Sequence, residues 1–406
     1  MKVLIFSEEY IKITKGMFVV WRNHVAGASK RCMVDILLNN EHWAVDEASE
    51  EFRANANVSL RQLPFKMPST LVKGLFGWCD NFWILRAGQY VLGQSLNLIM
   101  SPMIIFYLTL RLRQIKPSAV FSHNGGWPAG VLCRWIIVAA CFARVPKRIL
   151  IIHNYPQNFK GIVLRTLFSP IRFIQARLMD FCATSIVTVS DSVKAPLVSN
   201  VFYRPVARIH NGIPSMEQLP NVRSDIPSLD WQPSGAVVGF VGALYPLKGP
   251  HVLLDAFKLV DIPCELALLG PAEPLYLKTL QQKAELCANT VSFLGFHSNV
   301  DAFIQKIDIL VVPSIAFESF GMVILEAMKH NKPVICSDFG GMKEVVEDGV
   351  TGLVVPASDD VAMANAITKL LSDHDLMRQM GEAGYRRLND LFTLEKMVDQ
   401  YNELLG

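Results

Sequence analysis

The chain has 406 residues, of which 51% are hydrophobic and 18% are charged, and its formal net charge is +3. This length leaves room for two or three domains, and this composition excludes a disordered or a collagen-like protein. Residues 1–225 carry 26 Lys and Arg against 13 Asp and Glu (+13), and residues 226–406 carry 13 against 23 (−10). The basic excess comes without a nucleic-acid recognition motif. It favours an anionic membrane surface as a partner over nucleic acid, with a solvated basic face as the alternative.

The chain begins with MKVLIFSEEY, which is typical of a first β-strand followed by acids and not of a secretory signal. The longest apolar run, Leu96–Leu110, is interrupted by Asn97, Ser101 and Pro102, so we expect it to be too short to span a bilayer. It predicts a core helix with a basic end or a helix lying at a membrane interface. The eight cysteines form no C-x-x-C pair, which indicates free thiols in a reducing compartment. We therefore expect a cytoplasmic protein that can associate peripherally with the inner face of the membrane.

Short β-branched strands alternate with helical stretches through the first half, which predicts an α/β architecture with a parallel sheet. The expected strands are Lys2–Ser7, Cys32–Leu38, Ala119–His123, Arg148–His153, Ile186–Ser190 and Ala207–Asn211. The pattern is weak between Trp43 and Pro117. Residues 214–233 are rich in Pro, Ser and Asp, and this composition is typical of a linker.

The same alternation returns after the linker. The expected strands are Ala236–Val241, Cys264–Leu269, Val291–Leu294, Ile309–Val312, Pro333–Ser337 and Gly352–Val355. We thus expect a domain over residues 1–213, a second over 234–390, and a C-terminal helix over 391–406 that crosses back to the first. Two doubly wound domains joined by a linker form a cleft, and ligands of such folds bind at the carboxyl ends of the strands.

The most informative stretch is Ile307–Gly341, which predicts a strand, a loop, a helix, a strand and a double glycine. We expect Glu318 at the start of the helix Glu318–His330, and Glu326 eight residues further on. At about 100° per residue, the two carboxylates would lie about 80° apart around the axis and face one cleft. A helix N-terminus offers unpaired N–H groups and a positive dipole end. The stretch therefore predicts a site for a phosphorylated, polyhydroxylated ligand.

An ordered set of motifs carries a family resemblance in the second half. The motifs are VGALYPLKG (241–249), FLG (293–295), PS (313–314), ESFG (318–321) leading to Glu326-Ala327, GG (340–341), EVV (344–346) and DGVTG (348–352). The first half matches more loosely, through Gly16-Met17, HNGGW (123–127), His153, Val189-Ser190 and Asn211-Gly212. This set resembles the retaining glycosyltransferases of family four. The resemblance implies the GT-B fold, in which an acceptor-binding and a nucleotide-sugar-binding Rossmann-like domain face each other across a cleft.

The resemblance also implies roles for residues of the second half. Lys248 would be the main cation for the diphosphate leaving group, on which charge grows in the transition state. Glu318 would orient the donor sugar, and Glu326 would accept hydrogen bonds from the ribose hydroxyls. Other donor contacts would come from Gly242, Phe320, Gly321, Met322 and Val323. Ala243 stands where the family usually has an Arg, so another basic residue or backbone donors must supply that charge.

In the first half, the resemblance places Gly16 against the donor and His153 beside the reacting carbon of the sugar. His123 and Asn124 would line the acceptor pocket. Asn154 replaces the Asp that commonly follows the family's histidine. A retaining transfer needs no strong enzymic base, because the leaving phosphate can take the acceptor's proton. The sequence shows no cluster of Asp or His that demands a metal, and we expect no metal site and no cofactor.

The sequence thus predicts a retaining glycosyltransferase that uses a UDP- or GDP-sugar. The acceptor would be a hydroxyl of a glycan or lipid-linked molecule in cell-surface polysaccharide or lipopolysaccharide synthesis. Two alternatives stay open: a sugar-nucleotide epimerase on the same fold, and a non-catalytic sugar-nucleotide-binding protein, with which Ala243 and Asn154 are compatible. The absence of a G-x-G-x-x-G motif argues against a nicotinamide or flavin enzyme.

Overall fold

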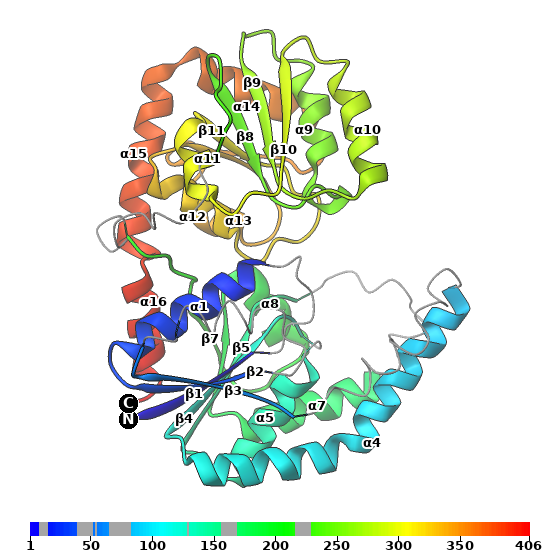
Figure 1. Cartoon of the computed structure of the whole chain (residues 1–406), viewed down its shortest axis with the longest axis vertical. Coiled ribbons are helices and arrows are strands. Elements are labelled where there is room, and N and C mark those ends of the chain that lie inside the picture. Colours follow the sequence, from blue (N-terminus) through cyan, green and yellow to red (C-terminus); the bar gives the residue numbers. More distant parts are fainter. Residues whose placement is uncertain are drawn as a thin grey trace. The chain divides into compact units, whose positions relative to one another are not determined.

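The computed structural model describes residues 1–7, 15–38, 52, 55–64, 83–127, 130–155, 169–215 and 229–406. These residues form two compact units (Figure 1). The first consists of Met1–Val189, Val193–Ile209 and Val398–Gly406, and the second of Ser190–Ser192 and His210–Met397. Each unit is built on its own parallel sheet with helices, so the expected architecture of two Rossmann-like α/β domains is confirmed. Most of the predicted linker 214–233 lies outside the described residues.

The first unit contains a seven-stranded sheet in the order β3-β2-β1-β4-β5-β6-β7, and every pairing in it is parallel. The order reverses between β1 and β4, from which β2 and β5 lie outward. The strands are β1 (Lys2–Ser7), β2 (Met33–Leu38), β3 (Val58–Gln62), β4 (Ala119–Asn124), β5 (Lys147–Ile152), β6 (Ser185–Thr188) and β7 (Val206–Arg208). The edge strand β3 is half exposed along its length, which explains why the sequence pattern around it is weak.

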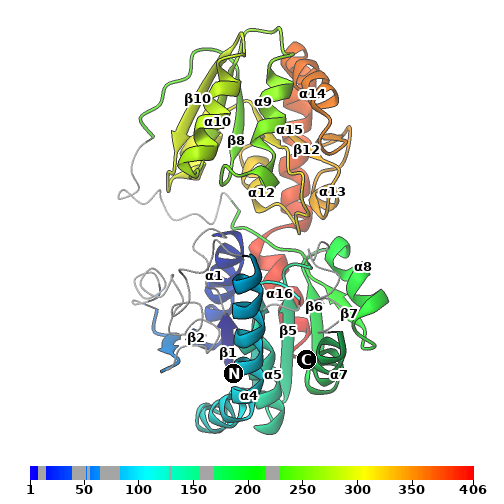
Figure 2. The same ribbon diagram turned by 90° about the vertical axis from the view of Figure 1, so that its right-hand side faces the viewer.

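The described helices of the first unit are α1 (Lys15–Ser29), α4 (Trp83–Ile115), α5 (Val131–Phe142), α7 (Ser169–Cys182) and α8 (Asp191–Asn200). Helix α5 is buried along most of its length because it packs between β4, β5, α4 and α7. Figure 2 shows α4 and α5 side by side on one face of this sheet. The Nη2 atom of Arg113 at the end of α4 donates to the carbonyl of Phe142 at 3.2 Å, which ties the two helix ends together.

Helix α4 corrects one expectation. The interruptions at Asn97, Ser101 and Pro102 do not end the helix, and it runs for 33 residues. Asn97 and Ser101 lie on its buried side, and the Ser101 hydroxyl donates to the Leu98 carbonyl at 2.7 Å. By length and composition alone, Ser95–Ile115 is long and apolar enough to cross a membrane, and 33% of an 18-residue window within it is buried in the protein. The expectation that this run was too short to span a bilayer is wrong about its length, because the helix continues through Asn97, Ser101 and Pro102.

The second unit contains a six-stranded sheet in the order β10-β9-β8-β11-β12-β13. The strands are β8 (Val237–Val241), β9 (Glu265–Leu269), β10 (Thr290–Gly295), β11 (Ile309–Val312), β12 (Val334–Ser337) and β13 (Gly352–Val355). The helices are α9 (Pro250–Phe257), α10 (Pro274–Ala284), α11 (Val300–Lys306), α12 (Met322–Lys329), α13 (Met342–Val345), α14 (Asp360–Ser372) and α15 (His374–Leu391). The central strands are apolar and almost fully buried, as expected for a parallel sheet covered on both faces.

The last helix, α16 (Leu394–Glu403), ends in the first unit, to which Val398–Gly406 belong. There it lies beside α1, as Figure 1 shows. Val398 packs against Gly27 so closely that a Cβ at Gly27 would lie 2.3 Å from the valine side chain. Arg31 forms an ion pair with Asp399. These contacts hold one face of α1 against α16.

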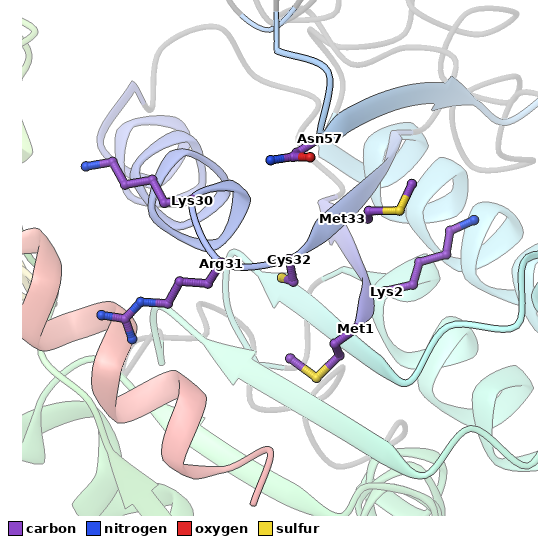
Figure 3. A pocket seen from close by; sticks show the side chains of 7 residues that line it. All are labelled: Met1, Lys2, Lys30, Arg31, Cys32, Met33 and Asn57. Atoms are coloured by element: carbon purple, nitrogen blue, oxygen red, sulfur yellow. The ribbon is translucent and has the colours of Figure 1, made fainter.

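A shallow hollow at the amino ends of β1 and β2 is shown in Figure 3, lined by Met1, Lys2, Lys30, Arg31, Cys32, Met33 and Asn57. Two of its three cations are already paired with carboxylates, because Lys2 lies 2.9 Å from Asp35 and Arg31 pairs with Asp399. It also lies at the edge of the sheet opposite to the carboxyl ends of the strands.

Candidate functional site

The second sheet has its switch point between β8 and β11, where the strand order reverses. Loops that leave such a pair of strands turn to opposite sides of the sheet, and the crevice that opens between them is the usual ligand site of a doubly wound fold. Lys248 lies in the loop that follows β8, and Glu318 lies in the loop that follows β11. The topology of the sheet therefore brings together two of the residues that the sequence singled out, although they are 70 positions apart.

Close backbone packing locks the two loops to each other. Gly249 has a φ of +72°, and a Cβ there would lie 1.9 Å from the carbonyl oxygen of Pro313. The Ile315 amide donates to the Leu247 carbonyl at 3.1 Å. Only glycine fits between the loops in this conformation. The residue before it, Lys248, is thereby held next to the loop that follows β11.

The Lys248 ammonium forms a hydrogen-bonded ion pair with the Glu318 carboxylate. The two side chains are 33% and 23% exposed, so the pair is partly open to solvent. Burial acts to lower the pKa of Lys248, but the charge and hydrogen bond of Glu318 outweigh it, and the net effect raises that pKa. Lys248 is thus a fixed cation at neutral pH, and without an anionic ligand its partner is Glu318.

The double glycine that the sequence singled out, Gly340-Gly341, packs against the backbone of Glu318. The Gly341 amide donates to the Glu318 carbonyl at 2.7 Å. A Cβ at Gly340, whose φ is +72°, would lie 2.1 Å from that carbonyl, and one at Gly341 would lie 2.2 Å from the carbonyl of Ser319. The backbone of Glu318 and Ser319 therefore rests directly on the turn after β12, and larger residues in that turn would displace it.

The expected helix Glu318–His330 is corrected at its start. Helix α12 begins at Met322, and Glu318 belongs to the loop before it. The angle of 80° between Glu318 and Glu326 therefore does not apply, because the two do not share one helix. The helix begins late because Gly321, with φ +86°, is its N-cap. Glu326 lies in the second turn of α12 and is half-buried.

The first turn of α12 has no side-chain cap: the Gly321 N-cap gives none, and Met322 and Val323 follow it half-buried. Its first backbone N–H groups therefore suit an anionic ligand. The side chain of Phe320 points the other way. It is 2% exposed and packs edge-to-face on Phe392 with ring centroids 5.8 Å apart. Any contact of Phe320 with a ligand thus has to come from its backbone.

Three glycines mark the carboxyl ends of the neighbouring strands β8, β9 and β10. The Gly270 amide donates to the Gly295 carbonyl at 2.8 Å, and a Cβ at Gly270 would lie 1.8 Å from the carbonyl of Gly242. These strand ends therefore present bare backbone to a ligand. Ala243, which follows Gly242, is half-buried and adds no charge, so Lys248 is the cation that this side of the site holds.

In the first unit, His123 lies at the end of β4 and His153 directly follows β5. The Nδ1 atom of His123 lies 3.0 Å from Nε2 of His153, and Nε2 of His123 lies 2.9 Å from Nδ1 of His24 in α1. Both ring nitrogens of His123 are therefore engaged by other histidines. Asn124 is also buried, and its Oδ1 accepts from the Gly126 amide at 3.2 Å.

The sequence reasoning missed His24, which has no motif around it and is brought to His123 only by the packing of α1 on the sheet. Gly16 lies in the first turn of α1, and the loop before it is outside the described residues. Among the residues that the structure describes, no group of three or more His, Cys, Asp or Glu side chains is placed to hold a metal ion.

Known proteins resemble the segment of the chain that contains these residues. Residues 222–387 match the family model of the glycosyl transferases group 1. This segment contains the Lys248–Glu318 pair, Glu326 and the double glycine. Residues 222–387 are thus similar to a group 1 glycosyltransferase domain. The part of the chain before this domain is not covered by the family model.

Relatives with the matching segment are named as glycosyltransferases. The chain is 32% identical over 169 residues to the O-antigen chain mannosyltransferase C of Escherichia coli, covering 41% of this chain and 45% of the relative. It is 27% identical over 304 residues to the capsular polysaccharide biosynthesis glycosyltransferase CapM of Staphylococcus aureus, covering 70% and 77%. The alignments to the first relatives, including the E. coli protein, span about 44–45% of their length.

Solved structures show the fold over the whole chain. Anabaena HepE in complex with UDP matches with a TM-score of 0.71 at 21% identity, covering 100% of this chain and 99% of the other. WaaG, a glycosyltransferase involved in lipopolysaccharide biosynthesis, matches with a TM-score of 0.63 at 16% identity, covering 100% of both chains. These likenesses establish the GT-B type of fold that the resemblance implied, with two parallel-sheet Rossmann-like domains.

Proposed function

We propose that this protein is a retaining glycosyltransferase that moves a sugar from a nucleoside-diphosphate sugar to an acceptor hydroxyl. The observation that carries the proposal is the Lys248–Glu318 pair at the switch point of the group 1 domain. A cation beside bare backbone amides suits a diphosphate, and a carboxylate beside it suits a sugar hydroxyl. An epimerase or a non-catalytic binding protein would use the same pair, but the named relatives favour transfer.

The pair exchanges partners when the donor binds. The ammonium of Lys248 turns from Glu318 to the diphosphate, and Glu318 then accepts from a hydroxyl of the sugar. Met322 and Val323 contribute backbone N–H groups, with Phe320, Gly321 and Gly242 forming the wall. Glu326, in the next turn of α12, receives the ribose hydroxyls. From the first unit, Gly16 and His153 are assigned to the donor. His123 and Asn124 are fully buried, and both ring nitrogens of His123 bond to other histidines, so neither is assigned a direct contact with the acceptor.

The reaction needs no protein nucleophile. The bond between the anomeric carbon and the diphosphate oxygen breaks, and its electron pair leaves with the nucleoside diphosphate. The acceptor oxygen forms the new bond on the same face, and its proton passes to the departing phosphate. Lys248 and the amides stabilise the charge that grows on that phosphate. The products are the glycoside and the nucleoside diphosphate, and the step uses no cofactor or metal.

UDP is the preferred carrier in this proposal, since Anabaena HepE is a fold neighbour solved with UDP and with UDP-glucose, and GDP is the alternative. The relatives named for O-antigen and capsular polysaccharide synthesis support a glycan or lipid-linked acceptor of the cell surface.

The outer face of α4 supports a membrane-bound acceptor. Leu92, Ile99, Met103, Phe106 and Leu110 are exposed and follow one another at intervals of seven, four, three and four residues, which places them on one side of the helix. Exposed arginines follow at the end of the helix, where Arg113 contacts Phe142, itself an exposed aromatic. An apolar stripe with a basic end fits an anionic membrane surface.

On this proposal the protein works at the inner face of the cytoplasmic membrane. The seven cysteines that the structure describes are all free thiols, which fits that compartment. Sedimentation with anionic vesicles at low and high salt tests the association. Phe106→Gln should weaken it, whereas Leu259→Gln, at an apolar site in the second unit that is 51% exposed against 65% for Phe106, should not. Equal sedimentation of both variants and of the parent would remove the α4 face from the proposal.

Two measurements test the transfer. A thermal-shift screen across UDP-, GDP- and ADP-sugars should show a rise with one of the three, by mass action. With that donor, nucleoside diphosphate should appear in step with glycosylated acceptor, and NMR of the product should show the anomeric configuration of the donor. Inversion of the configuration would refute the retaining mechanism. Conversion of the donor without any acceptor would identify an epimerase instead.

A further inference from the structure

Three buried histidines of the first unit form one hydrogen-bonded row. His24 comes from α1, His123 from β4 and His153 from the residue after β5. The Nδ1 atom of His24 lies 2.9 Å from Nε2 of His123, and the Nδ1 atom of His123 lies 3.0 Å from Nε2 of His153. Their residues are 2%, 0% and 6% exposed, so water does not replace these bonds. The row is linear and connects a helix to the carboxyl ends of two adjacent strands.

Packing holds the row in place. The rings of His123 and His153 are stacked with centroids 5.2 Å apart at an interplanar angle of 17°. The ring of His24 stacks on Tyr401 of α16 at 4.4 Å and 19°, and it meets Phe121 edge-on at 4.8 Å. The ring of His24 is thus confined by Tyr401 and Phe121, and none of the three rings can turn without breaking a hydrogen bond.

All three rings are neutral at physiological pH. Burial lowers the pKa of His24 to about 3 and that of His153 to about 4, and it holds the pKa of His123 well below its ordinary value. A neutral imidazole carries one N–H, so one of its nitrogens donates and the other accepts. In each bond of the row, one nitrogen must therefore carry the hydrogen and the other must not.

This rule leaves two arrangements for the row. If Nδ1 of His24 donates to Nε2 of His123, then Nδ1 of His123 must donate to His153, and His153 keeps its hydrogen on Nδ1. If the direction is reversed, all three rings carry the hydrogen on Nε2. The three rings must therefore share one tautomer, and that choice decides whether the remaining nitrogen, Nδ1 of His153, is a donor or an acceptor.

We propose that His24 and His123 are positioning residues that fix the orientation and tautomer of His153 for its contact with the donor sugar. The inference rests on the proposed function for the role of His153, but the row itself does not. A histidine that presents a defined donor or acceptor to a sugar oxygen needs such support, because a free neutral ring populates both tautomers. The row gives His153 this support without placing a charge beside it.

The test uses the full chain labelled with ¹⁵N-histidine, with long-range ¹H–¹⁵N correlation spectra of the imidazole nitrogens. The spectra should show three rings that stay neutral between pH 5 and pH 8 and share one tautomer. Two variants assign them and separate position from packing. His24→Phe keeps the stack on Tyr401 and loses the hydrogen bond. His24→Asn puts an amide near the Nδ1 position and loses the stack.

The order of the two variants in stability should be the reverse of their order in kcat. His24→Phe should be the more stable one, yet it should show a mixture of tautomers at His153. Its kcat should fall by about 10- to 100-fold at nearly constant KM for the donor, by analogy with the loss of a partner that orients a metal-bound histidine. His24→Asn should be less stable but should keep a larger share of kcat.

Different tautomers within the row would overturn the proposal, as would a His24→Phe variant whose His153 spectrum and kcat are unchanged. If no donor supports turnover in any variant, the proposed function fails, and the spectra still decide whether the row exists.

Discussion

Removing the cation at position 248 separates catalysis from stability. The Lys248–Glu318 pair is partly exposed, with side chains 33% and 23% accessible. Ion pairs of this kind contribute only about 0–1 kcal/mol to folding, because solvent screens them. On the proposed function, the same ammonium faces a charge that develops on the diphosphate in the transition state. Loss of one such group costs about 3–4 kcal/mol, which is about 100- to 1,000-fold in kcat. Lys248→Met should therefore nearly abolish transfer and leave the fold intact.

The chain offers a matched control in the same unit. Lys258 pairs with Asp255 at 2.8 Å, and the side chains are 25% and 29% exposed, so the two ion pairs are alike in exposure. Lys258→Met should lower the melting temperature by no more than about 4 °C, as should Lys248→Met, while keeping kcat within about twofold. The assay is release of nucleoside diphosphate under saturating donor, with calorimetry on both variants. Turnover by Lys248→Met within a few fold of the parent, or an equal loss in Lys258→Met, would refute the assignment.

Three further outcomes follow from the second unit. Gly249→Ala should lower the free energy of unfolding by about 2–4 kcal/mol in urea titrations, because the added Cβ would lie 1.9 Å from a carbonyl oxygen. The control Gly235→Ala, where φ is +95° but the space around the Cβ is open, should lower it by about 1–2 kcal/mol. Burial would raise the pKa of Asp301, but its bonds to two basic side chains lower it to about 2, below the unfolded value of about 3.9, so its stabilisation is lost as pH falls from 4 to 2 and Asp301→Asn should flatten that part of the stability profile. Glu318→Gln should bind UDP as tightly as the parent or up to about fivefold more tightly by calorimetry, while losing turnover, and clearly weaker binding would contradict the exchange of partners.

The sheets were predictable from the sequence because their strands are apolar runs bounded by turn residues. The carboxyl ends of β8, β9 and β11 fall within a residue of their expected positions. The start of α12 was not predictable from propensity. Glu318, Ser319 and Phe320 are compatible with a helix, and the loop exists because Gly321 adopts φ +86° and the turn at Gly340 and Gly341 packs underneath. Both causes are tertiary, and a local pattern cannot show them.

Some residues of the candidate site were likewise predictable from the sequence, and others were not. Lys248 and Glu318 stood in motifs, and their contact follows from the strand order once the switch point is known. His24 stood in no motif. It lies in the middle of α1, where a histidine next to apolar residues reads as an ordinary helix residue. Its partners come from β4 and α16, which are far away in the sequence. Only coordinates could connect these three elements.

On the proposed function, Lys248 and Glu318 neutralise each other before the donor binds. The pair is partly exposed, so this pairing contributes little to folding, but it keeps a lone carboxylate from repelling an incoming diphosphate. When a donor arrives, its diphosphate supplies the negative charge that Lys248 gives up, and its sugar supplies the hydroxyl donors that Glu318 needs. A bare nucleoside diphosphate satisfies only the first half of this exchange and leaves the carboxylate without a donor. On the proposed function, the site is therefore complementary to the intact sugar nucleotide and should bind the nucleoside diphosphate product less tightly.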